Sequence, residues 1–152
     1  MKKSQNKKEP LLFLDNIQFY EQGVKTNFNR IKYITWLNSI ARYHHQKIGL
    51  VSYCFMNDQD LLKINIEHLQ HDYYTDIITF QLNEKNEDLE ADIYISIDRV
   101  KDNAKQNKVL FSIELRRVLA HGLLHLIGFK DKTKNDQTKM REAEDHALSL
   151  YQ

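Results

Sequence analysis

The sequence of 152 residues has one cysteine, one proline and four glycines. Cys54 cannot form a disulfide within the chain, so a disulfide framework and a multi-cysteine zinc site are both excluded. No apolar run approaches the ~20 residues that a membrane helix needs, and the N-terminus is polar rather than an apolar signal segment. We therefore expect a cytoplasmic protein that has no membrane partner.

The sequence also has no large excess of basic residues over acidic residues, or of acidic over basic. The 22 basic and 21 acidic residues give a net charge of +1, which is no argument for or against a polyanionic partner. Basic residues do gather between Lys130 and Arg141, and acidic residues gather at 84–90. Such runs are mostly solvated surface, although the basic run directly follows the chemical motif described below.

The chain shows no internal repeat and no linker-like stretch of low complexity. A hydrophobic content of 41% with 28% charged residues is typical of a globule with one buried core. We expect a single domain over residues 10–152 that is preceded by a disordered tail at residues 1–9.

Strands are predicted where β-branched and aromatic residues cluster. Four stretches have this character: 11–20, 50–56, 77–82 and 91–96. A short polar loop joins the last two stretches, which favours an antiparallel pair because that connection needs the fewest residues.

Helices are predicted where apolar residues recur at three- and four-residue spacing. Five segments show it: one between 27 and 45, one capped by Asn57 or Asp58, one capped by Ser96, one capped by Ser112 and ended by Gly128, and one from about residue 135. Strands in the first two thirds of the chain and helices after them indicate an α+β fold. The expected architecture is a small mixed β-sheet with helices packed mainly on one face.

The distinctive chemical feature is a pair of histidines, His121 and His125, four residues apart on a predicted helix. Side chains at this spacing leave the same helix face one turn apart, so both imidazoles can bind one ion. Gly128 ends the helix and can adopt the positive φ that turns the chain back, which places Asp131 as a third ligand. Two imidazoles and a carboxylate suit one zinc ion per chain and leave a fourth position for a catalytic water.

Histidines at this spacing also occur by chance on ordinary helices. Three features favour a metal site here. The surrounding stretch is apolar, and burying an imidazole without a partner there is costly. Gly122 lies inside the helix at a cost of about 1 kcal/mol. Finally, a carboxylate follows the turn.

The residue between the histidines excludes one familiar chemistry. Zinc peptidases carry their general-base glutamate directly after the first histidine, and that position is Gly122 here. The expected element is thus a zincin-like metal helix without the peptidase base. A glycine at this position also leaves room beside the metal for a bulky substrate such as a phosphodiester strand.

The segment His-Gly-x-Leu-His-Leu-x-Gly-Phe at 121–129 resembles the signature of the YbeY family of metal-dependent, single-strand-specific endoribonucleases. The stretches 75–80 and 92–96 are similar to two strand sequences of that family, and the resemblance covers roughly residues 57–145. It implies a cytoplasmic zinc enzyme that acts on ribosomal RNA. The expected roles are maturation of the 3′ end of 16S rRNA and ribosome quality control, with the ribosome or its small subunit as partner.

Two positions depart from the family pattern. The usual third ligand is histidine, where this chain has Asp131. The family commonly has an arginine, a bidentate phosphate clamp, at the position of Leu69. Another cation must take its place, and the candidate substrate contacts are four side chains: His71, Arg99, Lys130 and Lys132.

The resulting hypothesis is metal-assisted hydrolysis of phosphodiester bonds in single-stranded RNA. The sequence identifies no catalytic group beyond a metal-bound water, and Asp76 and Asp92 are expected to make supporting or turn hydrogen bonds. Two alternatives stay open. One is a zinc peptidase with an unusual base, and the other is a non-catalytic zinc protein that binds RNA during ribosome assembly.

Overall fold

The computed structural model describes residues 15–84 and 87–152. The predicted tail at 1–9 and the first residues of the predicted strand 11–20 lie outside these ranges. The described residues form an α+β fold, as predicted. Its elements are β1 (Ile17–Glu21), α2 (Arg30–Tyr43), β2 (Ile48–Met56), α3 (Asp58–Leu69), β3 (Ile77–Gln81), β4 (Leu89–Ser96), α4 (Ile97–Asn107), α5 (Phe111–Ile127) and α6 (Lys134–Ser149).

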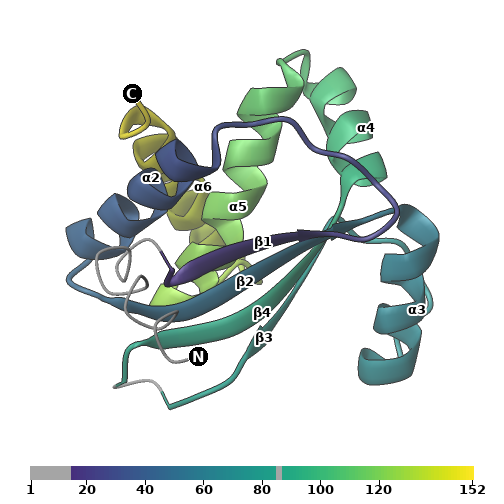
Figure 1. The fold of residues 1–152 in the computed structure, drawn as a ribbon, viewed down its shortest axis with the longest axis horizontal. Coiled ribbons are helices and arrows are strands. Elements are labelled where there is room, and N and C mark those ends of the chain that lie inside the picture. Colours follow the sequence, from purple (N-terminus) through teal and green to yellow (C-terminus); the bar gives the residue numbers. More distant parts are fainter. Residues whose placement is uncertain (1–14, 85–86) are drawn as a thin grey trace, which may run out of the picture.

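The four strands form one mixed sheet in the order β1-β2-β4-β3 (Figure 1). Strands β1, β2 and β4 run parallel, whereas β3 pairs antiparallel with β4. The predicted antiparallel pair is therefore confirmed. Strand β3 is at one edge of the sheet, which leaves its outer side available to a ligand.

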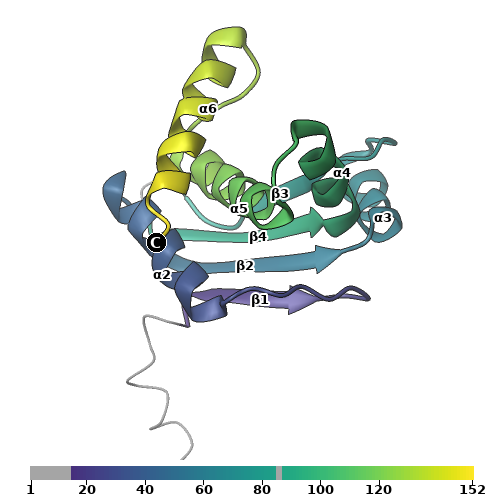
Figure 2. The ribbon, with the colours of Figure 1, turned by 90° about the horizontal axis from the view of Figure 1, so that it is seen from above.

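The helices pack mainly on one face of the sheet, as expected, and Figure 2 shows α2, α5 and α6 on that face. The main core lies between these helices and inward-facing strand residues such as Tyr53, Ile93 and Ile95, which are fully buried. Helix α3 covers part of the opposite face, where Leu61 packs with Met56. Alternate residues of β2 and β4 thus serve two separate cores.

Four helices begin at a side chain that accepts a hydrogen bond from the backbone. These caps are Asn29 of α2, Asn57 of α3, Ser96 of α4 and Thr133 of α6. Helix α5 differs, because it begins after Leu110 without a side-chain cap. The prediction that Ser112 caps it is wrong, because the helix already begins at Phe111 and Ser112 lies inside its first turn.

Helix α5 packs on the sheet beside β3 and β4, and Gly122 faces both strands. A Cβ atom on Gly122 would lie 2.9 Å from Ile77 Cδ1 and 3.3 Å from Ile93 Cδ1. The glycine therefore serves helix-to-sheet packing. The expectation that it leaves room beside the metal for substrate is wrong, because this position faces the sheet.

Within residues 15–84 and 87–152, no helix has both the length and the apolar character needed to cross a membrane.

Candidate metal centre

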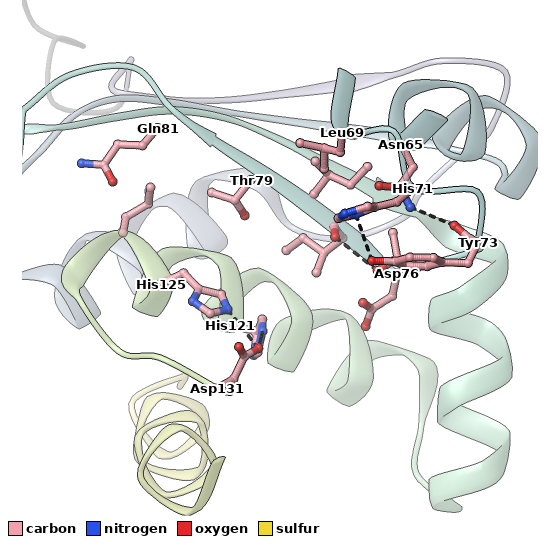
Figure 3. Close-up of a pocket in the computed structure, with 14 residues that line it drawn as sticks. Asn65, Leu69, His71, Tyr73, Asp76, Thr79, Gln81, His121, His125 and Asp131 are labelled. Carbon is pink, nitrogen blue, oxygen red and sulfur yellow. Dashed lines mark hydrogen bonds and ion pairs between the residues drawn. The ribbon is translucent and has the colours of Figure 1, made fainter. Parts of the chain in front are cut away.

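Three side chains converge at the C-terminal half of α5, as the sequence predicts. His121 and His125 lie one turn apart on the helix, and Gly128 ends the helix with a φ of 127°. The turn brings Asp131 back to the histidines (Figure 3). Its Oδ2 atom lies 3.2 Å from His125 Nε2 and 3.5 Å from His121 Nε2. One potential ligand atom from each residue falls within 4.8 Å of the other two.

The His125 ring is held in one orientation. Its Nδ1 lies 3.0 Å from the carbonyl oxygen of Phe129, which can only accept a hydrogen bond, so Nδ1 carries the proton. The lone pair of Nε2 then points toward the Asp131 carboxylate. Two acceptors that face each other at 3.2 Å are stabilised by a cation between them, so the arrangement fits a metal ion.

The His121 ring is held by a residue that the sequence analysis missed. Its Nδ1 lies 2.6 Å from Oε2 of Glu144, a buried carboxylate on α6. Arg117 of α5 pairs with the other oxygen of Glu144 at 3.0 Å. A carboxylate behind a ligating histidine fixes the ring and makes it a more basic ligand. The sequence does contain one signal for this role, because Glu144 is a charged residue within the apolar face predicted for the last helix.

The electrostatics at His121 agree with this geometry. Burial lowers the pKa of His121, but the hydrogen bond and charge of Glu144, together with Asp76 and Asp131, outweigh burial and raise it above the ordinary value. The negative surroundings attract positive charge at this ring, whether a proton or a metal ion carries it.

The chemistry of the donor set agrees with zinc. Two imidazole nitrogens and one carboxylate oxygen are among the ligand types that catalytic zinc sites use, with a position left for water or substrate. Within the part of the chain that the structure describes, this triad is the one cluster of three or more His, Cys, Asp or Glu side chains close enough to share an ion.

A cavity of about 490 Å³ opens beside the triad, and we call it the first cavity. The triad forms one side, the edge strand β3 forms another, and the segment after α3 forms the rim (Figure 3). Leu69 lies on this rim, and no lysine or arginine is among the described residues that line the cavity. Among the described residues that line the first cavity, histidines are therefore the only side chains able to carry positive charge.

His71 is the predicted substrate contact that lines this cavity. Its ring stacks on Tyr73 with centroids 5.1 Å apart, and the Tyr73 hydroxyl lies 2.9 Å from His71 Nδ1. Buried Asn65 fixes the segment, because its side-chain amide donates to the Tyr73 carbonyl oxygen at 2.8 Å. Two exposed rings are thus held at the rim by a buried polar anchor.

Asp76 also lines the first cavity. Burial raises the pKa of Asp76, the charge of His121 opposes this rise, and the net pKa is above the ordinary value. The backbone N–H groups of Asp76 and Ile77 also favour the ionised carboxylate, but they do not outweigh burial. A carboxyl that protonates more readily than usual therefore lies beside the metal centre.

The remaining predicted residues lie elsewhere. Arg99 does not line the first cavity, and Asp58 holds its guanidinium through Nε and Nη2 at 2.9–3.2 Å. Lys130 and Lys132 flank Asp131 on the exposed turn and are not among the residues lining the first cavity. Asp92 lies on β4, one residue from the fully buried Ile93, so its side chain points to the opposite face of the sheet from α5.

Comparisons of the sequence with known proteins identify one family, and a solved structure shares the fold. The family model described as "Endoribonuclease YbeY" matches residues 16–152. The Endoribonuclease YbeY of Cytophaga hutchinsonii is 47% identical over 137 residues, which cover 90% of this chain and 96% of that protein. That of Porphyromonas gingivalis is 42% identical over 137 residues and 90% of each chain. The solution structure of TM1509 from Thermotoga maritima matches with a TM-score of 0.64 at 25% identity, over 89% of this chain and 88% of that one.

Proposed function

The chain belongs to the YbeY family of endoribonucleases, and from this membership we propose that it is a metal-dependent endoribonuclease acting on single-stranded ribosomal RNA. The substrates that we propose are the 3′ end of 16S rRNA during maturation and rRNA in defective ribosomes. The small ribosomal subunit is then the partner, and the cytoplasm is the compartment.

The observation that carries the proposal is the arrangement of His121, His125 and Asp131 at the wall of an open cavity. We propose that they bind one zinc ion per chain. The chemistry that bound zinc supplies is polarisation of a phosphate oxygen and activation of a water molecule. The cavity beside the triad gives an extended strand access to that chemistry.

The other side chains of the site have supporting tasks. Glu144 and the Phe129 carbonyl keep the two imidazoles in a ligating orientation. Asp76, whose pKa is raised by burial, can accept and hold a proton beside the reacting phosphate. His71, steadied by Tyr73, can donate a hydrogen bond from Nε2 to a phosphate oxygen.

The two alternatives are less well supported. A peptidase needs a base on the metal side of the helix, and the position that carries it in zinc peptidases is Gly122, which faces the sheet. A purely structural zinc site does not need a cavity of about 490 Å³ at its ligands. Both observations favour hydrolysis of RNA.

The test is cleavage of single-stranded rRNA that contains the precursor 3′ end, by zinc-loaded wild type and by His125→Ala. We expect wild type to cut and His125→Ala to be inactive. The matched control is His68→Ala, which removes an exposed histidine of α3 outside the cavity and should retain wild-type activity. RNA binding without cut products from any variant would instead support the assembly factor.

A further inference from the structure

The candidate metal centre lies between two cavities. The first cavity opens toward β3, and a second cavity of about 270 Å³ opens on the side of α6. His121 and Asp131 line both cavities. Figure 3 shows the triad between β3 and α6, so a strand that leaves the first cavity across the triad enters the second.

The two cavities differ in charge. No lysine or arginine is among the described residues that line the first, whereas Arg141 of α6 lines the second. Arg141 also lines a neighbouring cavity together with Lys134 and Glu142, so a second basic side chain lies on the same side of α6. An anionic strand that crosses the triad from the first cavity therefore meets the guanidinium of Arg141 on the α6 side.

The guanidinium of Arg141 is available to a ligand. Its carboxylate contact among the described residues is Glu144, at 3.9 Å, which is too long for a hydrogen bond. Glu144 already pairs with Arg117 at 3.0 Å and with His121 at 2.6 Å, so it has closer partners than Arg141. The Arg141 side chain is 59% exposed and can turn toward a phosphate at small cost.

We propose that Arg141 is the phosphate clamp of this enzyme, binding a backbone phosphate next to the one at the metal centre. This inference rests on the proposed function and extends it, because it defines the path of the RNA from the first cavity across the triad to α6. A guanidinium binds two phosphate oxygens through parallel N–H donors, a geometry that lysine does not reproduce. Arg141 thus supplies the positive charge that the first cavity lacks.

The experiment measures RNA binding as well as cleavage. A short fluorescent single-stranded RNA is titrated with wild type, Arg141→Ala and Arg141→Lys, first with chelator, where nothing is cut, and then cleavage is followed with zinc. We expect Arg141→Ala to bind about tenfold more weakly. The slope of log K against log salt should become shallower by about 0.7, the value for one lost phosphate contact on a single strand. Arg141→Lys should fall between the two.

The matched control is Lys139→Ala, which removes one exposed positive charge from the same helix outside the second cavity. It should bind as wild type does, and zinc content and thermal unfolding should be unchanged in all variants.

Equal affinity and equal salt slope for wild type and Arg141→Ala would overturn the clamp while leaving the nuclease intact. Binding that depends on Arg141 without any cleavage by wild type would uphold the clamp and refute the nuclease. A wild type that neither binds nor cuts RNA would refute both.

Discussion

Glu144 is the residue that orients His121 in the candidate metal centre. This carboxylate is buried, and it divides its oxygens between His121 and Arg117. A buried carboxylate needs such partners, because burying an unpaired charge is strongly unfavourable. The hydrogen bond that His121 donates to Glu144 therefore also fixes the orientation of the His121 ring, a candidate ligand.

Replacing Glu144 with glutamine tests that role. Glutamine keeps the shape but loses the charge, so the His121 ring becomes less basic and its tautomer is no longer enforced. We expect Glu144→Gln to bind zinc about 10- to 100-fold more weakly, measured by competition with a chromogenic chelator. Asp145→Asn, at the exposed neighbour that also pairs with Arg117, is the control. Unchanged zinc affinity in Glu144→Gln would show that Glu144 has no influence on the ligand.

Asp76 carries the second prediction at this scale. If it accepts a proton during the reaction, Asp76→Asn should lower kcat by about 10²- to 10⁴-fold at unchanged zinc content. Because Asp76 must be ionised to act as a base, wild-type activity should rise with pH through its raised pKa. That acidic limb should be missing from the residual activity of Asp76→Asn. A limb of unchanged position in the variant would assign it to another group.

Sequence reasoning identified the three candidate ligands, which the structure brings together, but not the residues that support them. The spacing of His121 and His125 and the following turn are local, so they can be read from eleven consecutive residues. Glu144 comes 23 residues after His121, and only the packing of α6 on α5 brings the two together. The position of Arg99 depends likewise on its ion pair with Asp58, 41 residues away.

At the scale of elements, α5 is placed by its contact with the sheet at Gly122. A glutamate at this position, as in zinc peptidases, would meet Ile77 and Ile93 and would bury a carboxylate without a partner. We expect Gly122→Glu to lower the free energy of unfolding by more than about 3 kcal/mol, measured by urea denaturation, and to gain no peptidase activity.

Gly122→Ala separates the effect of size from that of charge. The added methyl group is crowded by Ile77, but alanine favours the helix by about 1 kcal/mol, so the net loss should be much smaller than for glutamate. A stable Gly122→Glu protein that cleaves peptides would contradict the orientation of α5 described above.

Helices α3 and α4 are joined at their N-termini by Asp58. Its carboxylate accepts hydrogen bonds from the Ser96 hydroxyl at 2.6 Å and from Arg99 at 2.9–3.2 Å. Burial raises the pKa of Asp58, but these hydrogen bonds and the Arg99 charge outweigh it, so the pKa lies below its ordinary value of 3.8. The ionised carboxylate thus stabilises the folded state.

This shift predicts a pH-dependent stability. A lowered pKa in the folded state gives stabilisation that is fully present above the ordinary value of 3.8 and is lost as pH falls through the folded-state pKa. Asp58→Asn should cost about 1–2 kcal/mol at neutral pH, and its difference from wild type should shrink under acid conditions. Asp72→Asn, at an exposed aspartate, is the control for urea unfolding. A difference that does not vary with pH would show that the Asp58 charge is not responsible.

The elements themselves were largely predictable. The caps Asn57 and Ser96 and the terminator Gly128 all act as the sequence indicated, because capping depends on side chains next to the helix end. The Ser112 prediction failed because α5 begins one residue earlier, after Leu110, whose side chain cannot accept a hydrogen bond. A capping residue near a helix end therefore does not always mark that end.

At the scale of the whole molecule, the candidate metal centre joins α5, the turn after it and α6 through the triad and Glu144. A ligand that binds the folded state alone stabilises it by about 2.7 kcal/mol at a hundred times its dissociation constant. Zinc should therefore raise the Tm of wild type, measured by calorimetry, and chelator should reverse the rise. His121→Ala should show no such response. An equal rise in that variant would indicate binding elsewhere.

The α+β class and the antiparallel β3–β4 pair followed from the sequence, since both depend on neighbouring segments. The strand order did not, because β2 lies between β1 and β4 through two parallel pairings whose partners are distant in the chain. That order is what presents β3 as a free edge beside the triad. The cavity is thus a property of the complete fold.

The most direct test of the central claim is crystallographic. Crystals of the zinc-loaded protein, measured at wavelengths on both sides of the zinc absorption edge, show where the metal binds. We predict one strong anomalous peak per chain, enclosed by Nε2 of His121, Nε2 of His125 and the carboxylate of Asp131, with Glu144 still bonded to His121. No peak at this position, or a peak that Asp131 does not contact, would contradict the account.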